Sequence, residues 1–371
     1  MKVYLDAVST TSLHPEVKET YKKLLDDYYC NSDALYDDGV VIYDMQEKSR
    51  EVLCSLLGLR KNELIFTSGA SEANSLAIKG YCFRHPEKKH LITSIYEHSS
   101  VYNSFKQLEE DFGYKVTYLY PDEWGHITPE QVSSALREDT ALVSIMAVNN
   151  EIGAVNDIAA IAQAVKKHRG SCFHCDITQA LGKIDLDLHQ VDMASFSAHK
   201  IHGLKGSGAL IKKEYIELLP IISGGQQEFS LRGGTSNALT NIVLAKTLRI
   251  ALENKEKYHD HLLRLHDILT EGLKDIAEIN YEGGLISLVN ISTPIPSEVL
   301  LNALNAKGIM VSSKSTCGSR ENEPNRTLRS MHIDEDHAIR VSFDYTNNEE
   351  EMQYFIDCLK EIIEQYAGIA I

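Results

Sequence analysis

The stretch SFSAHKIHGLKGSGAL, residues 195–210, places Lys200 between two apolar segments and directly before a glycine-rich turn. MASFSA (193–198) and GALIKK (208–213) both have the composition of buried strands. Two glycines lie between the lysine and the second apolar segment, and a third opens that segment; they let the backbone approach another group closely. A lysine at a strand end is usually solvated, so the rest of the sequence has to decide whether Lys200 has a chemical role.

Five further apolar runs precede this pair, and amphipathic segments separate them. The runs are ELIFTS (63–68), KHLITS (89–94), KVTYLY (115–120), TALVSIMAV (140–148) and CFHCDI (172–177). AAIAQAVKKH (159–168), between two of them, has the apolar spacing of a helix. Alternating strands and helices are typical of a parallel α/β sheet. We therefore expect a large α/β domain over residues 14–250.

The pattern changes near residue 245. The expected elements are then a long polar helix (246–276), an apolar strand (285–292), a helix (297–308), the strand IRVSF (339–343) and a closing helix. They predict a smaller C-terminal α+β domain over residues 251–371, completed by residues 1–13. No linker rich in proline, glycine or serine separates the two domains, so we expect them to pack closely.

The bulk composition is that of an ordinary globular chain. Its 371 residues are 43% hydrophobic and 24% charged, which argues against a disordered or fibrous protein. The formal net charge of -16 opposes broad binding to nucleic acid or anionic lipid. No apolar run approaches the roughly 18 residues that a membrane helix needs, and the first residues turn polar too soon for a signal peptide. We expect a cytoplasmic protein that binds neither membranes nor nucleic acid directly.

The seven cysteines are an odd number spread thinly through the chain, which argues against a secreted disulfide framework. Cys172 and Cys175 form a C-x-x-C pair, which could be a redox site. The pair lies inside the expected strand 172–177, however, and no second pair completes a zinc site. Buried strand thiols are the favoured interpretation, and no metal site is predicted.

Reactive groups follow the ends of the expected strands, which is where open α/β sheets bind ligands. Residues 68–71, in FTSGASEAN, lie between a strand and a helix. They could hold a phosphate through free amides, or simply cap the helix. Asp176 ends the strand in HCDITQ, where a lone aspartate is more often a cap. Asn149 and Asn150 follow TALVSIM, where a turn is the default interpretation.

Taken together, these groups match the needs of pyridoxal phosphate. Residues 68–71 offer an anion cradle, and Asp176 offers a carboxylate for the pyridinium nitrogen. The asparagine amides can orient the phenolic oxygen, and Lys200 can form an imine. A nicotinamide cofactor fits less well, because GLKGSG follows the reactive residues and opens no clear helix.

Eight segments, in their order along the chain, carry a resemblance to a known family. They are YLDAVSTT, FTSGASEANSLAIKG, HLITSIYEHSSV, VSIMAVNNEIGAVNDI, HCDITQALGK, SFSAHKIHGLKGSGAL, LRGGTSN and VSSKSTCGS. Over almost its whole length the chain resembles the cysteine desulfurases of the NifS/IscS type, in the class V aminotransferase group of pyridoxal-phosphate enzymes. The resemblance implies a fold-type I transferase that acts on L-cysteine, with a mainly parallel seven-stranded sheet in its large domain.

The resemblance also implies roles for individual residues. Lys200 is the covalent anchor of pyridoxal phosphate and removes the α proton of the substrate, while His98 stacks on the cofactor ring. Asp176 contacts the pyridinium nitrogen, and Asn150 and Gln179 lie near the substrate or the ring oxygen. The implied phosphate ligands are Ala70, Ser71, Ser197 and His199, with Thr235 reaching the cofactor of a partner subunit. A homodimer is thus implied.

Desulfuration also requires a thiolate that attacks the substrate sulfur. The family nucleophile corresponds to Cys317, in VSSKSTCGSRENEP, where Lys314 and Arg320 would favour the thiolate. Without the resemblance, a plain surface thiol is equally compatible. Arg340, in IRVSF, corresponds to the arginine that clamps the substrate carboxylate, whereas without the family it suggests a surface ion pair. The implied products are L-alanine and a persulfide on Cys317, which passes to an acceptor protein: an iron–sulfur scaffold or a tRNA- or cofactor-thiolating enzyme.

Two other functions stay open at this point. One is a different pyridoxal-phosphate reaction, a β-lyase or selenocysteine lyase, in which Cys317 is incidental. The other is a non-enzymatic binding module for sulfur-transfer proteins. It is motivated by NSDALYDDG (31–39), where Ser32 and Tyr36 replace the family's proline and histidine in a loop expected to border the active site. Lys314 and Thr316 also depart from the family pattern.

Overall fold

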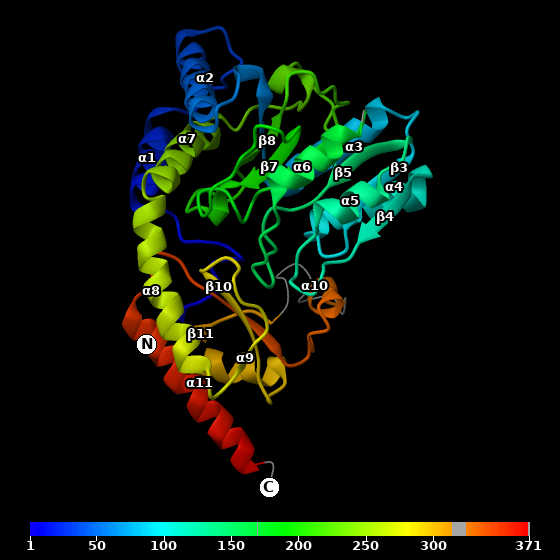
Figure 1. Cartoon of the computed structure of the whole chain (residues 1–371). Coiled ribbons are helices and arrows are strands. Elements are labelled where there is room, and N and C mark those ends of the chain that lie inside the picture. Colours follow the sequence, from blue (N-terminus) through cyan, green and yellow to red (C-terminus); the bar gives the residue numbers. More distant parts are fainter. Residues whose placement is uncertain (169, 314–323, 370–371) are drawn as a thin grey trace.

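The seven apolar runs form one sheet. The computed structural model describes residues 1–168, 170–313 and 324–369 (Figure 1). The strand order is β2-β8-β7-β6-β5-β3-β4. The strands are β2 (Leu64–Thr67), β3 (His90–Ser94), β4 (Lys115–Leu119), β5 (Thr140–Ser144), β6 (Cys172–Asp176), β7 (Met193–Ser197) and β8 (Gly208–Lys212). Neighbouring strands are parallel except that β8 is antiparallel to β2 and β7. The prediction of a mainly parallel seven-stranded sheet is confirmed.

β8 runs against its neighbours because its connection to β7 is short. Only a 3-10 turn, Ala198–Lys200, and residues 201–207 separate the two strands. A parallel partner would need a crossover of about a dozen residues or more, usually with a helix. The same short connection fixes Lys200 at the carboxyl end of β7, on the edge of the sheet where ligands bind.

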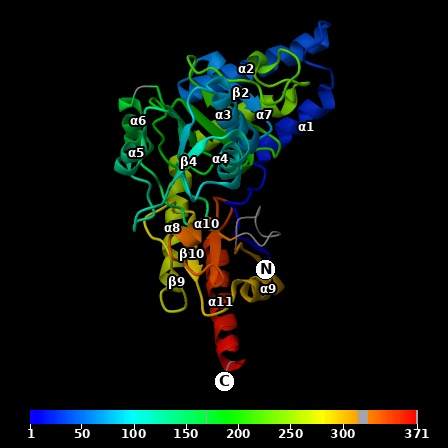
Figure 2. The ribbon, with the colours of Figure 1, turned by 90° about the vertical axis from the view of Figure 1, so that its right-hand side faces the viewer.

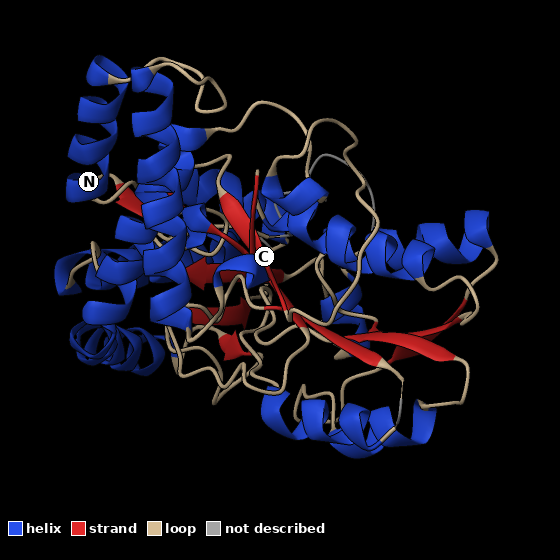
Figure 3. Cartoon of the chain, turned by 90° about the horizontal axis from the view of Figure 1, so that it is seen from above, coloured by secondary structure: helices blue, strands red, loops and turns tan. Residues whose placement is uncertain are grey.

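Helices cover both faces of this sheet (Figure 3). Leu91 of β3 packs in the core on one face, and its neighbour Ile92 packs in the core on the other. Successive side chains of a strand point to opposite faces, so apolar runs without alternation are buried on both sides. The covering helices are α3 (Ala70–Arg84) and α4 (Ser99–Phe112) on one face, and α5 (Pro129–Ala135), α6 (Ile158–Lys167) and α7 (Ala238–Glu253) on the other. Two more helices, α1 (Pro15–Asp27) and α2 (Asp37–Leu57), pack beside α7.

A second, smaller set of strands has its own apolar core, which includes Leu265, Ile291 and Phe355. The strands are β12 (Ala338–Ser342), β10 (Leu288–Ser292) and β9 (Glu278–Ile279), all antiparallel, and the parallel pair β1 (Val3–Tyr4) and β11 (Ile309–Met310). The helices are α8 (Lys255–Leu273), α9 (Ser297–Ala306), α10 (Arg326–Ser330) and α11 (Glu349–Ile369). α8 and α11 lie side by side in Figure 1 and Figure 2. The domain boundaries at residues 13 and 250 stay a prediction.

The prediction of one long polar helix over residues 246–276 is wrong in one respect. The chain forms two helices, α7 and α8, separated at Asn254, whose φ of -102° and ψ of 3° are not helical. The Asn254 side chain donates a hydrogen bond of 2.9 Å to the Ile250 carbonyl, and asparagine competes with helical backbone bonding in this way. Because of the break, α7 packs against the large sheet and α8 against the small one.

The N-terminal segment joins the two sheets. Asp6 forms a parallel bridge with Ser342 of β12. The Thr11 amide donates a hydrogen bond of 3.0 Å to the His199 carbonyl, directly before Lys200. Residues 7–10 therefore cross from the small sheet to the large one past the lysine.

The two cysteines of the C-x-x-C pair lie in a strand of the large sheet. Cys172 and Cys175 are free thiols buried in β6, and burial raises the pKa of both. This fits buried strand thiols and not a reactive redox pair. Across the described ranges, no helix combines the length and the apolar character needed to cross a bilayer.

Candidate active site

A cavity of about 910 Å³ opens at the carboxyl ends of the large sheet. It gathers residues that lie far apart in the sequence. The predicted site residues that line it are Ala70, Ser71, His98, Asn150, Asp176, Gln179, Ser197, His199, Lys200 and Arg340. Sequence reasoning missed Val8, Ser9, Met146, Val148 and Thr178, which also line it. Cys317 lies outside the described residues.

Lys200 is held by the N-terminal segment. Its Nζ donates hydrogen bonds to the carbonyl oxygens of Val8, at 2.7 Å, and Ser9, at 2.6 Å. The Gln179 side chain donates to the same Val8 carbonyl, at 3.0 Å. The amine therefore lies in the wall of the cavity at a defined position. Val8 and Ser9 belong to the segment YLDAVSTT, but nothing in the local sequence predicts which side chain their carbonyl oxygens contact.

The start of α3 forms a close backbone junction with β7 and β8. The N-cap is Gly69, with φ of 148° and no side-chain cap, and the Ala70 amide donates to Ser197 Oγ at 2.7 Å. A Cβ on Gly208 would lie 2.7 Å from Gly69 Cα, so only glycine fits there. Glu72 does not cap the helix, since it accepts the Ser68 amide and pairs with Arg232. The first turn of α3 is thus available to an anion.

Asp176 is a buried carboxylate at the end of β6. It accepts hydrogen bonds from Asn74 Nδ2, at 2.8 Å, and from the Thr178 amide, at 2.9 Å. Within the described part of the chain, neither a lysine nor an arginine forms an ion pair with it. Beside it, Thr178 Oγ1 is buried without a hydrogen-bond partner among the described residues. A buried carboxylate without a cation is costly, which suits a site whose ligand brings the positive charge.

Two histidines in the cavity wall are neutral at neutral pH. His98 is the N-cap of α4, and its Nδ1 accepts a hydrogen bond from the Ser100 amide. Burial lowers the pKa of His98. Burial, and then the Lys200 ammonium, lower the pKa of His199 to about 4. A neutral ring can stack on a flat ligand or accept a hydrogen bond without adding charge.

Arg340 reaches the cavity from β12 and is only 2% exposed. One end of its guanidinium donates to the Asn150 carbonyl and to Glu151, at 2.8 and 3.1 Å. The other end donates to Asp6 and Ser9, at 3.1 and 2.8 Å. The alternative interpretation of Arg340 as part of a surface ion pair is therefore wrong, because its ion pairs are buried. Burial raises the pKa of Glu151, against the opposing effect of Arg340.

A buried polar layer behind the cavity was also missed. The His174 ring bridges the hydroxyls of Ser144 and Ser195, at 2.8 and 2.9 Å, between neighbouring strands. Glu97, directly before His98, accepts hydrogen bonds from Ser94 and from the Met146 amide. Burial raises the pKa of Glu97 to about 8, so this side chain holds a proton at neutral pH.

Two predicted features lie away from this cavity. Thr235 is exposed and is not among the lining residues. No residue of the segment 31–39 lines the cavity of this chain either. Instead α2 begins at Asp37, so Asp37 and Asp38 lie in its first turn, where the helix dipole favours acidic residues. Leu35 is 95% exposed.

Comparisons with known proteins agree with this geometry. The chain matches the family model for class-V aminotransferases over residues 3–355. It is 39% identical over 379 residues to the cysteine desulfurase IscS of Pectobacterium atrosepticum, covering 98% of this chain and 93% of that protein. It is 35% identical over 380 residues to a NifS/IcsS protein homolog of Lactobacillus delbrueckii subsp. bulgaricus, covering 99% and 98%.

Solved structures give the same result. A NifS-like protein superposes with a TM-score of 0.92 at 33% identity, covering 98% of this chain and 100% of that one. A structure of SspA in complex with cysteine superposes with a TM-score of 0.81 at 31% identity, covering 92% and 99%. From the fold, the convergent cavity and these full-length similarities together, we conclude that the chain belongs to the class-V aminotransferase family.

Proposed function

We propose that this chain is a pyridoxal-phosphate-dependent cysteine desulfurase, which converts L-cysteine to L-alanine and leaves a persulfide on Cys317. The observation that carries the proposal is the cavity itself. A lysine amine, a neutral histidine, a carboxylate without a cation and an open helix start converge there from four separate strand ends. The relatives named as cysteine desulfurases, matched over nearly their full length, support this reaction over other chemistry of the family.

The donor set fits pyridoxal phosphate. The phosphate would bind at Ala70, Ser71, Ser197 and His199, where the first turn of α3 has no side-chain cap. Asp176 would pair with the ring nitrogen and supply the anion that a pyridinium needs. His98 would cover one face of the ring. When bound, pyridoxal phosphate supplies an electron sink for the α carbon of an amino acid.

The protein residues then handle protons, charge and sulfur. Lys200, as a neutral amine, accepts the α proton of the substrate. Arg340 and Asn150 orient the substrate carboxylate. The Cys317 thiolate attacks Sγ of the substrate, forming a sulfur–sulfur bond as the carbon–sulfur bond breaks. The electron pair stays with the β carbon, which takes up a proton to become a methyl group, and the proton held by Lys200 returns to the α carbon to give alanine.

The decisive experiment treats the protein, loaded with pyridoxal phosphate, with L-cysteine in the absence of reductant. Peptide mass spectrometry then locates persulfides while alanine and pyruvate are assayed in the same sample. We expect alanine together with a persulfide on the Cys317 peptide. Cys317→Ser should remove both, while Cys30→Ser, which changes a half-buried thiol outside the cavity, should keep both. Pyruvate without a persulfide would instead identify a β-lyase, and cofactor-loaded protein without product would favour a binding module.

We also propose a homodimer in which Thr235 reaches the partner's cofactor. Thr235 is exposed and lies outside its own chain's cavity. Nearby segments expose apolar side chains that a monomer rarely leaves in water, and a 2.7 Å hydrogen bond from Gln227 to Asp33 holds these segments together. The exposed apolar residues are Tyr29, Leu35, Tyr36, Ile221, Ile222 and Phe229.

Mixed dimers test this arrangement. Lys200→Ala protein and Thr235→Val protein would be unfolded together and refolded, and pyridoxal phosphate binding would be measured. If Thr235 acts across the interface, each mixed dimer contains one site with both residues intact, and tight binding reappears in the mixture. If Thr235 acts within its own chain, no site regains both residues and the mixture binds no better than the separate variants.

The sulfur acceptor that we propose is a protein, either an iron–sulfur scaffold or a tRNA- or cofactor-thiolating enzyme. We place the reaction in the cytoplasm, since the six cysteines in the described part of the chain are all free thiols. Affinity capture from the source organism, followed by transfer of labelled sulfur from Cys317 to each captured protein, would identify the acceptor. A captured protein that takes no label would be a bystander.

A further inference from the structure

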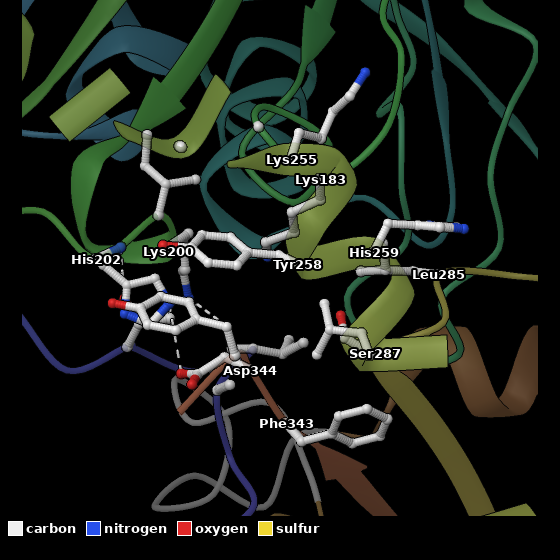
Figure 4. A pocket seen from close by; sticks show the side chains of 18 of the residues that line it. Lys183, Lys200, His202, Lys255, Tyr258, His259, Leu285, Ser287, Phe343 and Asp344 are labelled. Carbon is white, nitrogen blue, oxygen red and sulfur yellow. Dashed lines mark hydrogen bonds and ion pairs between the residues drawn. The ribbon is translucent and has the colours of Figure 1, made fainter. Parts of the chain in front are cut away.

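A second cavity lies on the other side of Lys200. It is partly open to solvent, and the space between its walls is about 750 Å³ with that open part included. Val8 and Lys200 line both cavities, so they form the wall between them. The lining comes from the N-terminal segment, from the segments that follow β6, β7 and β12, from residues 285–287, and from α7 and α8. Figure 4 shows Lys183, Lys200, Tyr258 and Asp344 around this space.

Most of the lining is apolar or aromatic. The rings of Tyr258 and Tyr345 stack face to face, with centroids 4.2 Å apart and planes inclined by 8°. Leu285 and Phe343 line the cavity as well. The Tyr345 hydroxyl is buried and has no hydrogen-bond partner among the described residues. Such walls suit a ligand with a flat or aliphatic apolar body.

Lys183 is one of three lysines in the lining, with Lys200 and Lys255. Its Nζ donates one hydrogen bond, of 2.8 Å, to Gln179 Oε1, although an ammonium has three protons to donate. In the described ranges no carboxylate lies within ion-pair distance of it. The nearest acidic group in the lining, Asp344, faces His202 at 3.6 Å. Burial, and then the Lys200 ammonium, lower the pKa of Lys183 to about 7, while Asp344 opposes the shift.

The other charged and titratable groups in the lining do not neutralise Lys183. Lys255 pairs with Asp185 outside the cavity. His202 contacts the Ser12 carbonyl through Nδ1, and burial lowers its pKa. His14 caps α1, and His259 belongs to α8. Lys183 therefore has spare donors beside apolar walls, which is the complement of an anion with an apolar body.

We propose that this cavity is a second ligand site, which binds a small carboxylic acid with an apolar body. The carboxylate accepts hydrogen bonds from Lys183, and the body lies against the Tyr258 ring. Gln179 connects this site to the first cavity, because it accepts from Lys183 and donates to the Val8 carbonyl that also holds Lys200. A bound acid would draw the Lys183 proton toward itself and alter this chain of hydrogen bonds. The proposal does not rest on the proposed desulfurase activity.

The test uses 4-fluorobenzoate and the full-length protein as purified, with binding followed by fluorine NMR. We expect saturable binding that weakens about tenfold or more in Lys183→Met, because a charge-assisted hydrogen bond is lost. Lys183→Arg should keep much of the affinity. Neutral 4-fluorobenzamide should bind more weakly than the acid. Thr178→Val, an isosteric change in the lining of the first cavity alone, should leave 4-fluorobenzoate binding intact, which separates this cavity from the first.

A calorimetric readout protects the test from a variant that fails to fold. At about pH 8, Lys183 in the wild type is largely neutral, so carboxylate binding should take up protons, as measured in two buffers of different ionisation enthalpy. Lys183→Gln should bind weakly and take up none. Binding that is equally tight in the Lys183 variants, binding lost only in Thr178→Val, or wild-type binding without proton uptake would each overturn the proposal.

Discussion

Adding one methyl group at Gly208 should damage both the fold and the cofactor site. A Cβ there would lie 2.4 Å from the Phe196 carbonyl oxygen and 2.7 Å from Gly69 Cα. Both neighbours are backbone, so neither can rotate away. Overpacking a core by a methyl costs about 1–3 kcal/mol, and we expect the upper end, about 3 kcal/mol. If half of that strain displaces the start of α3, the affinity for pyridoxal phosphate falls about tenfold, since 1.4 kcal/mol is a factor of about ten.

Gly206→Ala is the matched control, two residues earlier in the same turn. Gly206 has φ of 74°, and no atom lies within 4 Å of the place that a Cβ would occupy there. Its substitution should cost about 1–2 kcal/mol from the left-handed backbone alone and leave cofactor affinity unchanged. Equilibrium unfolding in urea gives the stability of both variants, and titration of the apoprotein with pyridoxal phosphate gives the affinity. Wild-type affinity in Gly208→Ala, or equal losses in both variants, would refute the reasoning.

Three further predictions concern buried ionisable side chains. Glu228→Gln breaks a buried pair with Arg50, in which both oxygens lie 2.8 Å from the guanidinium, and should cost about 3–5 kcal/mol in urea unfolding; a loss below about 1 kcal/mol would contradict this. The pKa of Glu97 is raised to about 8 in the native state, whereas in the unfolded state this carboxyl loses its proton near its ordinary pKa of 4.5. The native state therefore binds one more proton between these two pH values, and the free energy of unfolding falls as pH rises toward 8. Because glutamine does not titrate, Glu97→Gln should become more stable relative to the wild type as pH rises from 4.5 to 8. Parallel plots of unfolding free energy against pH for the two proteins would contradict this prediction. The pKa of His199 is lowered to about 4 in the native state, so this residue should reduce stability as pH falls from 6.5 to 4. In His199→Asn the unfolding free energy should therefore fall less steeply over that pH range. An unchanged slope would contradict the lowered pKa of His199.

The strands of the large sheet could be predicted because they are local features. Most of the runs from 63–68 to 208–213 are apolar at successive positions, and this pattern predicts burial on both faces without knowledge of the neighbours. The exception is KVTYLY, whose strand β4 lies at the edge of the sheet and is only partly buried. The side chains that follow those runs, such as Asp176 and Lys200, were therefore correctly expected at one edge of a sheet. The glycines after Lys200 also indicated that the backbone there lies close to another group, but they did not indicate which group.

The helix break at Asn254 was not predicted because periodicity alone cannot separate one long helix from two. The polar and apolar residues of 246–276 keep a helical spacing through the break. The decision came from outside the segment, since α7 packs against the large sheet and α8 against the small one. Tertiary packing overrode local propensity here.

The sequence by itself determined the fold class, the strand-end residues and the family, because periodic burial and short motifs are written in neighbouring residues. Only the tertiary structure decided what those residues meet. Arg340 contacts Asp6 across 334 positions of sequence, and Lys200 meets the Val8 carbonyl across 192. Contacts at such separations depend on how the two sheets are joined and leave no local pattern. The cavity at Lys183 arises for the same reason, since it exists only where the two sheets and α8 come together.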